Sequence, residues 1–171
     1  MADLELNGWD LIVFDADGTL RRTTVPGQPC PHTQGEWELL PGVAETLREI
    51  AGAARPPHLG VATNQDHVGY GLLEETVARQ LVQDLFVAAI GRPLEAEAVV
   101  LCPHPREAGC GCHKPAPGML HRLMAHFGAC PEGTLFVGDA PTDREAAERA
   151  RVTFAWAWDF FGWGWRGGGV A

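Results

Sequence analysis

The sequence predicts an α/β fold, a doubly wound parallel β-sheet with helices on both faces. Two observations indicate this class. Short apolar segments rich in β-branched and aromatic residues alternate with longer segments whose apolar residues recur at helical spacing. Polar side chains also follow directly after several of the short segments, and in such a sheet ligands bind at the carboxyl ends of the strands.

The first predicted strand, residues 11–14, is the apolar run Leu-Ile-Val-Phe between turn-forming residues. Similar runs predict four further strands, at residues 58–62, 98–101, 134–137 and 152–156. Helical spacing predicts the intervening helices at residues 42–54, 72–89, 117–127 and 143–150. One face of the second helix is expected to carry Leu73, Val77, Leu81, Leu85 and Ala88. Thr142 is expected to cap the last helix.

Two segments lie outside this alternation. Residues 21–41 are rich in Pro and Gly and are expected to form a long irregular flap beside the first loop. Residues 158–171 form an aromatic and Gly-rich tail without periodicity, for which burial against the domain or a partner surface is expected. Residues 1–171 are expected to be one domain, with no insertion long enough for a large cap domain.

Composition narrows the class of protein. The chain has 171 residues, of which 46% are hydrophobic and 20% charged, as in a globular domain. A formal net charge of −9 argues against a non-specific nucleic-acid binder. There is no apolar stretch long enough for a membrane span, and the acidic N-terminus lacks the pattern of a signal peptide. A cytoplasmic location is expected, and a monomer is favoured.

Two aspartates, Asp15 and Asp17, directly follow the first predicted strand. Two carboxylates at such a loop repel each other unless a cation neutralises them or one takes a proton. An Asp-Gly turn or a calcium loop would explain the same residues. A calcium loop needs further oxygen ligands, however, and residues 20–22 are Leu-Arg-Arg. Phosphoryl chemistry on Mg²⁺ is therefore the favoured interpretation.

Further polar residues follow the other predicted strands. They are Thr63 and Asn64 after the second, Lys114 beyond the third, and Asp139 and Asp143 after the fourth. Because the carboxyl ends of parallel strands meet in one crevice, these side chains are expected to gather around the two aspartates.

Residues 102–112 contain three cysteines and a histidine, Cys102, His104, Cys110 and Cys112. Three thiolates and one imidazole make a complete tetrahedral zinc set with no open position, so the predicted zinc is structural. His113 competes with His104 for the fourth place. Cys30 and Cys130 are expected to be unpaired bystanders, and no constellation distinguishes the remaining histidines, His32, His58, His67, His121 and His126.

With these motifs in order, the chain resembles the haloacid dehalogenase (HAD) superfamily of phosphohydrolases. The resemblance covers residues 9–157 and implies a HAD-like, Rossmannoid fold. Within the superfamily, residues 63–65, the cysteine loop and residues 114–119 resemble the capless histidinol-phosphatase and heptose-bisphosphate-phosphatase group, which carries a structural zinc. Where that group has an Arg before the motif lysine, this chain has His113, so a weaker grip on phosphate and a different substrate range are expected.

The resemblance also implies roles for the residues. Asp15 is expected to be the nucleophile, and Asp17 the general acid and then the base for water. Thr63 and Lys114 are expected to hold the transferring phosphoryl group, with Asn64 and His113 binding substrate. The expected Mg²⁺ ligands are Asp15, Asp139 and the main-chain carbonyl of Asp17. Asp143 either holds a metal-bound water, orients Lys114, or simply suits the first turn of its helix.

The expected function is that of a Mg²⁺-dependent phosphomonoesterase that hydrolyses a small phosphorylated metabolite, either a sugar bisphosphate or an amino-alcohol phosphate such as histidinol phosphate. The expected partner is therefore a small phosphate ester, with no membrane or nucleic acid. An open site also admits a polynucleotide 3′-end, which is the alternative enzyme. A binding module that keeps the fold without turnover is the non-enzyme alternative.

Overall fold

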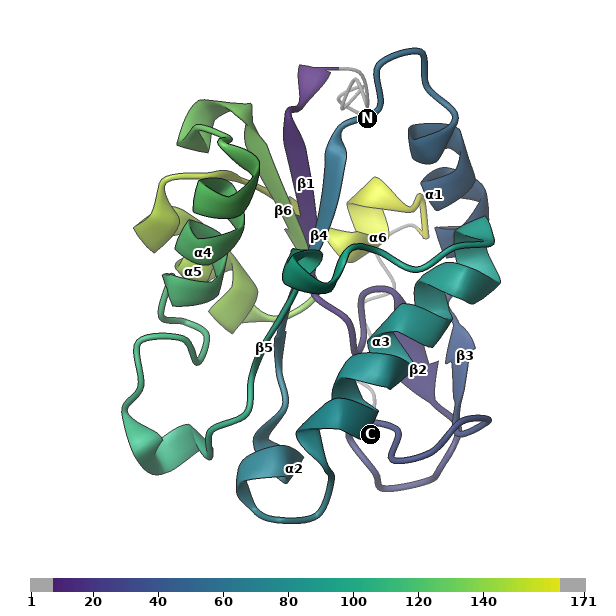
Figure 1. Cartoon of the computed structure of the whole chain (residues 1–171), viewed down its shortest axis with the longest axis vertical. Coiled ribbons are helices and arrows are strands. Elements are labelled where there is room, and N and C mark those ends of the chain that lie inside the picture. The colour runs from purple at the N-terminus through teal and green to yellow at the C-terminus, as the bar shows by residue number, and fades with distance from the viewer. Residues whose placement is uncertain (1–7, 164–171) are drawn as a thin grey trace.

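The computed structural model describes residues 8–163. Five strands form one parallel sheet, and they are β1 (Leu11–Phe14), β4 (His58–Asn64), β5 (Val99–Cys102), β6 (Thr134–Gly138) and β7 (Thr153–Trp156). Their order across the sheet is β5-β4-β1-β6-β7, with β1 at the centre (Figure 1). This arrangement confirms the predicted α/β class.

The central strand β1 is buried on both faces, and none of its four side chains is exposed. Phe14 at its end is in register with Val61 of β4 on one side and Val137 of β6 on the other. The chain builds β4 and β5 on one side of β1 and then crosses to build β6 and β7 on the other. The crevice between the ends of β1 and β6 is therefore the switch point at which such sheets bind ligands.

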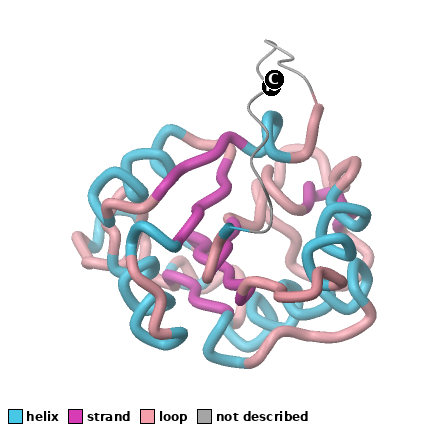
Figure 2. Tube along the Cα trace, turned by 90° about the horizontal axis from the view of Figure 1, so that it is seen from above, coloured by secondary structure: helices cyan, strands magenta, loops and turns pink. Residues whose placement is uncertain are grey.

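Two helices cover each face of the sheet (Figures 1 and 2). One face is packed by α1 (Val43–Ala51) and α3 (Glu75–Ile90), and the other by α4 (Gly118–Phe127) and α5 (Pro141–Ala150). Alternate residues of β1 point to opposite cores: Ile12 and Phe14 to the first, Leu11 and Val13 to the second. The short elements are α2 (Asp66–Gly69), α6 (Ala157–Phe160), η2 (Ala96–Ala98), η3 (Arg106–Ala108) and η4 (Pro131–Gly133).

Two details of the predicted helices are wrong. The predicted helix 72–89 begins at Glu75, and its buried face consists of Ala78, Leu81, Val82, Leu85, Phe86 and Ala89. Val77 and Ala88 are exposed, because α3 is turned so that Phe86 and Val82 fill the core in their place. The last helix begins at Pro141 and has Ala140, not Thr142, at its N-cap position.

The prediction that residues 21–41 form an irregular flap is wrong for the two ends of this segment. Its ends form an antiparallel hairpin of β2 (Arg21–Thr23) and β3 (Trp37–Leu39), in which Arg22 is opposite Glu38. Each strand has three residues, too few for an alternating pattern to be visible in the sequence. The Pro- and Gly-rich residues between the two strands form the loop, so the flap has a paired base and an irregular tip.

The described start of the aromatic tail packs against the domain. Phe160 and Phe161 contact the ring of Phe14, with ring centroids 5.7 and 6.2 Å away. Residues 164–171 of the predicted tail lie outside the described residues. Among the helices in residues 8–163, none is long and apolar enough to cross a membrane. This part of the chain also contains no large cap domain, as predicted.

Candidate active site

The site is built where β1 and β6 end side by side. Asp15 follows β1, and its backbone N–H donates to the carbonyl of Val137 in β6 at 2.9 Å. Asp139 follows β6 directly. The parallel pairing of these two strands therefore places both aspartates at the switch point of the sheet.

Lys114 lies between two of the carboxylates. Its Nζ is 2.6 Å from Oδ1 of Asp15 and 2.7 Å from Oδ1 of Asp143, and it also donates to the carbonyl of Ala62 at 2.9 Å. Burial alone would lower the pKa of Lys114, but the charges of Asp15 and Asp143 outweigh burial and raise the pKa above its ordinary value. Lys114 is therefore a fixed cation at the centre of the site.

Three carboxylates converge beside this cation. Oxygen atoms of Asp15, Asp139 and Asp143 lie within 4.8 Å of one another. Burial raises the pKa of Asp15 well above its ordinary value, against the opposing charge of Lys114, and burial together with Asp143 raises the pKa of Asp139. An excess of buried negative charge with oxygen donors fits a hard divalent cation such as Mg²⁺. Asp15 and Asp139 thus stand where predicted, and Asp143 joins them.

Gly18 is required for this convergence. Its φ is +92°, and a Cβ atom on it would lie 2.3 Å from Oδ2 of Asp139. Any side chain at this position would displace the Asp139 carboxylate, because that close approach leaves room for hydrogen alone. The next residue, Thr19, donates its hydroxyl to Oδ1 of Asp139 at 3.0 Å. The turn after β1 therefore both admits and orients the carboxylate that follows β6.

The Asp17 carboxylate is not a member of this group. It accepts hydrogen bonds from Nε of Arg21 at 2.8 Å and from Nε2 of Gln65 at 2.9 Å. Gln65 also donates to the hydroxyl oxygen of Thr63, at 3.1 Å, so these side chains form one chain of contacts. The side chain of Asp17 is thereby held apart from the three convergent carboxylates, and its predicted metal contact is that of its main-chain carbonyl.

Asp143 combines two of the roles considered for it. One carboxylate oxygen, Oδ1, pairs with Lys114. The other, Oδ2, accepts the backbone N–H groups of Ala140 at 3.0 Å and Asp139 at 3.2 Å, in the first turn of α5. The residue therefore satisfies the exposed N–H groups of the helix start while it orients the lysine.

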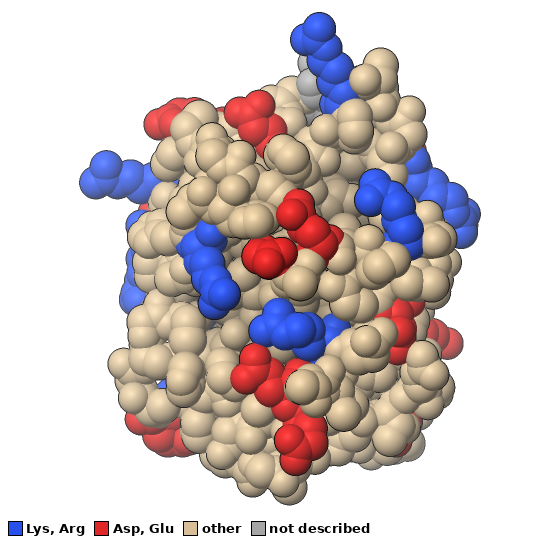
Figure 3. All heavy atoms as spheres, viewed as in Figure 1, with Lys and Arg blue, Asp and Glu red and all other residues tan. Residues whose placement is uncertain are grey.

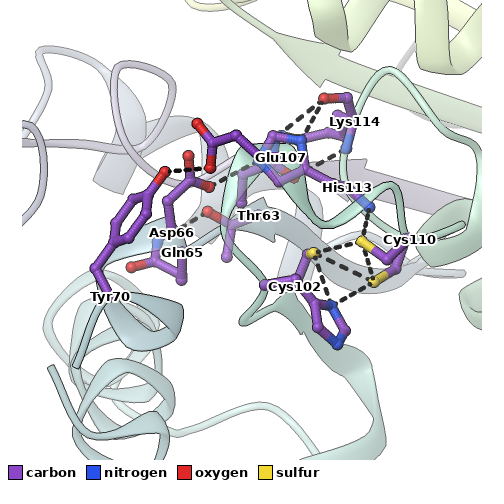
Figure 4. A network of polar contacts seen from close by, with 12 residues as sticks. Thr63, Gln65, Asp66, Tyr70, Cys102, Glu107, Cys110, His113 and Lys114 are labelled. Carbon is purple, nitrogen blue, oxygen red and sulfur yellow. Dashed lines mark hydrogen bonds and ion pairs between the residues drawn. The ribbon is translucent and has the colours of Figure 1, made fainter.

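Asn64 holds the backbone of the lysine. Its Oδ1 accepts the N–H of Lys114 at 3.0 Å, and its Nδ2 donates to the Lys114 carbonyl at 3.2 Å. His113 next to it has Nε2 2.7 Å from a carboxylate oxygen of Asp66 and Nδ1 2.9 Å from the Lys114 carbonyl. Both predicted substrate-binding residues are thus engaged with protein groups. Figure 4 shows His113 beside Lys114.

The predicted zinc residues come together. The Cys102 sulfur is 3.5 Å from Cys110 Sγ and 3.2 Å from Cys112 Sγ, and His104 Nδ1 is 3.3 Å from Cys112 Sγ (Figure 4). Burial opposes ionisation, but hydrogen bonds from Cys112 and His113 lower the pKa of Cys110 to about 6. Three sulfurs and one nitrogen at these separations fit a tetrahedral zinc ion. His113 is not a member of the group, which supports His104 as the fourth donor.

A cavity of about 440 Å³ opens beside the site. His113 and Lys114 form part of its wall, together with Asn64 and Thr142. Two arginines, Arg106 and Arg149, line it as well. The cavity therefore has the central lysine and two further cationic side chains in its lining, and it has room for a substrate larger than phosphate alone.

Several residues of the site were not found from the sequence. Arg21 is fully buried, whereas Arg22 beside it is exposed, and nothing in the sequence distinguishes the two. Gln65 belongs to residues 63–65, but its contacts with Asp17 and Thr63 were not predicted. The description of Cys30, His32 and His67 as residues without a constellation was wrong, because their donor atoms lie within 4.8 Å of one another. They join segments 35 residues apart, which no local spacing reveals.

The site has two aspartates after β1, with a lysine and further aspartates around them, and this arrangement is typical of a class of hydrolases. A family model of haloacid dehalogenase-like hydrolases matches residues 30–151. The chain belongs to this family. Among its relatives is D-glycero-beta-D-manno-heptose-1,7-bisphosphate 7-phosphatase of Pseudomonas aeruginosa, which is 31% identical over 137 residues, 80% of this chain and 74% of the relative. D-glycero-alpha-D-manno-heptose-1,7-bisphosphate 7-phosphatase of Mycobacterium bovis is 33% identical over 137 residues, 80% of this chain and 70% of the relative.

A solved structure is similar throughout most of the fold. The D,D-heptose 1.7-bisphosphate phosphatase of B. bronchiseptica, complexed with magnesium and phosphate, has a TM-score of 0.70 and 27% identity, and the match covers 85% of this chain and 78% of that one. The family and these relatives confirm the predicted resemblance and the prediction of a phosphatase.

Proposed function

We propose that the chain is a Mg²⁺-dependent phosphomonoesterase that removes one phosphate from a sugar bisphosphate. The observation that carries the proposal is the position of Lys114 between Asp15 and Asp143, with Asp139 converging on the same point. Such a group combines a carboxylate nucleophile, a fixed cation for phosphate oxygens and oxygen donors for a metal ion. Bound Mg²⁺ neutralises the charges of the carboxylates and of the phosphate as they approach each other.

In the first step, a carboxylate oxygen of Asp15 attacks phosphorus and the bond from phosphorus to the sugar oxygen breaks. Asp17 gives its proton to that leaving oxygen, which departs as an alcohol. Thr63 and Lys114 donate hydrogen bonds to the phosphoryl oxygens during the transfer. The product of this step is an acyl phosphate on Asp15.

In the second step, Asp17 is a carboxylate and takes a proton from a water molecule that attacks phosphorus. The bond from phosphorus to Asp15 breaks, inorganic phosphate is released, and Asp17 is protonated for the next cycle. Arg21 and Gln65 orient Asp17 for both proton transfers. This division of labour is supported by the separation of the Asp17 side chain from the three carboxylates.

A bisphosphate is supported by the cavity and by the relatives. Arg106 and Arg149 line the same cavity as Lys114. Their guanidinium groups suit the binding of a second phosphate on the sugar. The matching relatives act on heptose 1,7-bisphosphates, of the beta form in one case and the alpha form in another. On the face drawn in Figure 3, acidic and basic side chains are interspersed and form no continuous basic stripe, which favours a small substrate over a polynucleotide.

The test is a phosphate-release assay with Mg²⁺ on both anomers of the heptose bisphosphate, a sugar monophosphate, histidinol phosphate and an oligonucleotide 3′-phosphate. We expect the highest kcat/KM on one of the bisphosphates and no activity after chelation of Mg²⁺. Higher kcat/KM on the oligonucleotide or on histidinol phosphate would contradict the proposed substrate. No phosphate release from any of these compounds would instead favour the binding module.

A further inference from the structure

A second cluster of metal-binding side chains lies outside the zinc loop. Cys30 and His32 belong to the flap loop between β2 and β3, and His67 belongs to α2. His67 Nδ1 is 3.6 Å from Cys30 Sγ and 2.7 Å from His32 Nε2. Cys30 is buried and both imidazoles are half-buried. One sulfur and two nitrogens therefore point at a common centre within the protein.

The flap repeats the start of the zinc loop. Residues 30–32 read Cys-Pro-His, and so do residues 102–104, which begin the zinc loop. In the zinc loop, this tripeptide supplies a sulfur and a nitrogen to the group, with Cys102 Sγ 3.5 Å from His104 Nδ1. The same short unit thus contributes two donors to each cluster, and His67 takes the place that the two later cysteines have in the zinc loop.

The distances suit a zinc ion. Bond lengths of about 2.3 Å to sulfur and about 2.0 Å to nitrogen place tetrahedral donors about 3.5 Å apart for a sulfur–nitrogen pair and about 3.3 Å for two nitrogens. The Cys30–His67 separation of 3.6 Å is close to the first value. The His32–His67 pair, at 2.7 Å, needs an opening of about 0.6 Å, which a small rotation of one ring provides.

The flap loop is held in the shape that presents these donors. A carboxylate oxygen of Glu36, Oε2, accepts the backbone N–H groups of His32 at 2.8 Å and Thr33 at 3.1 Å. The same oxygen accepts Nε2 of Gln28 at 3.2 Å, and Gln28 also donates to the carbonyl of Cys30 at 2.7 Å. Cys30 and His32 are therefore positioned by the loop's own hydrogen bonds.

We propose that Cys30, His32 and His67 bind a second zinc ion, which fastens the flap to α2 and keeps a fourth coordination position open. Three protein ligands with one free position differ from the closed set of the zinc loop. The ion joins the flap, whose base carries Arg21, to the helix whose first residue, Asp66, contacts His113. Figure 1 shows α2 and the flap loop at the end of the molecule where the sheet strands terminate. Zinc binding there orders the flap that borders the active site.

Two other roles of this cluster were compared with a zinc site, a reactive thiol and a metal-free hydrogen bond. A reactive thiol has to be accessible to its reaction partner, but Cys30 is buried. A hydrogen-bonded pair of imidazoles would hold the flap without metal. That arrangement predicts one zinc per chain, in the zinc loop alone.

The test is zinc stoichiometry, measured by elemental analysis after the metal-free full chain is reloaded with Zn²⁺ and desalted. We expect about two zinc ions per chain for the wild type, and about one for His67→Gln and for Cys30→Ser. Cys130→Ser and His121→Gln change exposed residues outside the cluster and are expected to keep both ions. Circular dichroism verifies folding, and His67→Gln serves if the buried Cys30 variant does not fold.

A second measurement tests the fastening of the flap. Hydrogen exchange of residues 24–36 is expected to slow on zinc addition in the wild type but not in His67→Gln. One zinc per chain in the reloaded wild type would overturn the proposal, as would two in both His67→Gln and Cys30→Ser. Neither measurement depends on phosphatase activity, so a negative result for the second zinc ion leaves the proposed function unaffected.

Discussion

The buried guanidinium of Arg21 donates from Nε to Oδ1 of Asp17 at 2.8 Å, so the first residue of the flap hairpin orients the proposed general acid. The ion pair spans one tight turn, since the two residues are four positions apart. The rigid, planar guanidinium of Arg21 restricts the Asp17 carboxylate more than a flexible ammonium group would. The base of the flap therefore helps to fix the position of the proton-transferring group.

Arg21→Met is expected to lower kcat by about 10- to 100-fold, because Asp17 loses the group that orients it. Mg²⁺ affinity is expected to change little, since the three convergent carboxylates do not contact Arg21. Steady-state kinetics and Mg²⁺ titration measure the two effects separately. Arg22→Met is the matched control, since Arg22 is exposed and pairs with Glu38. Equal kcat for the two variants would contradict the role of Arg21.

Asp15→Asn is expected to lower kcat by about 1,000-fold or more, because an amide cannot form the covalent intermediate. The fold is expected to remain, as shown by circular dichroism and an unchanged size on gel filtration. Phosphate release from the preferred substrate is the assay. Retention of more than about 5% of wild-type activity would rule out Asp15 as the nucleophile.

Asp139→Asn is expected to raise the melting temperature of the Mg²⁺-free protein at pH 7. The pKa of Asp139 is raised in the folded state, so between the unfolded and folded values the folded state binds more protons than the unfolded state. The free energy of unfolding therefore falls as the pH rises through this window. Above the window, the charged Asp139 carboxylate destabilises the folded state by the full amount. The gain from the substitution should shrink as pH is lowered toward the unfolded pKa of about 3.9.

Thermal unfolding with and without Mg²⁺ measures this effect. Mg²⁺ is expected to stabilise the wild type and to stabilise Asp139→Asn much less, since one ligand is lost. Asp159→Asn, at an exposed position, is the control and should behave like the wild type. Equal stabilisation of Asp139→Asn and the wild type by Mg²⁺ would show that Asp139 is not a ligand.

Cys110→Ser is expected to release the zinc of residues 102–112 and to lower the melting temperature by roughly 5–10 °C before it abolishes activity. The loop has little apolar core of its own, so the metal supplies much of its order. Cys130→Ser is the matched control, because Cys130 is exposed and free. Zinc content and thermal unfolding are the measurements. A zinc-free wild type, or one that melts at the same temperature as Cys110→Ser, would contradict this prediction.

His113→Arg is expected to lower KM for a bisphosphate roughly tenfold and for a monophosphate less, with kcat nearly unchanged. An arginine at this wall of the cavity offers a permanent charge and a bidentate fork, whereas both His113 nitrogens already face protein oxygens. Steady-state kinetics on the two substrates is the measurement. His126→Arg, outside the cavity lining, is the control. Identical kinetics for wild type and His113→Arg on both substrates would show that residue 113 does not contact substrate.

The strands and the convergence of polar residues were predictable because both depend on local patterns. Each strand is a buried apolar run, and the parallel topology then brings Asp15, Lys114 and Asp139 to one edge of the sheet. What escaped prediction depends on contacts between distant segments. The Gln65–Asp17 hydrogen bond joins residues 48 positions apart, and the meeting of Cys30 with His67 joins residues 37 positions apart. The flap strands were missed because three residues carry no readable period.

The two hydrogen bonds from Asn64 to the backbone of Lys114 separate the residues that position the catalytic lysine from those that determine the substrate preference. The lysine is anchored from the β4 side, independently of the loop that precedes it, so insertions or substitutions between His104 and Cys110 can reshape the cavity wall without displacing the ammonium group. New specificities can then arise by loop exchange while the hydrolytic step is retained. A grafted loop that carries the four zinc donors and ends at His113 should therefore transfer substrate preference with little loss in kcat.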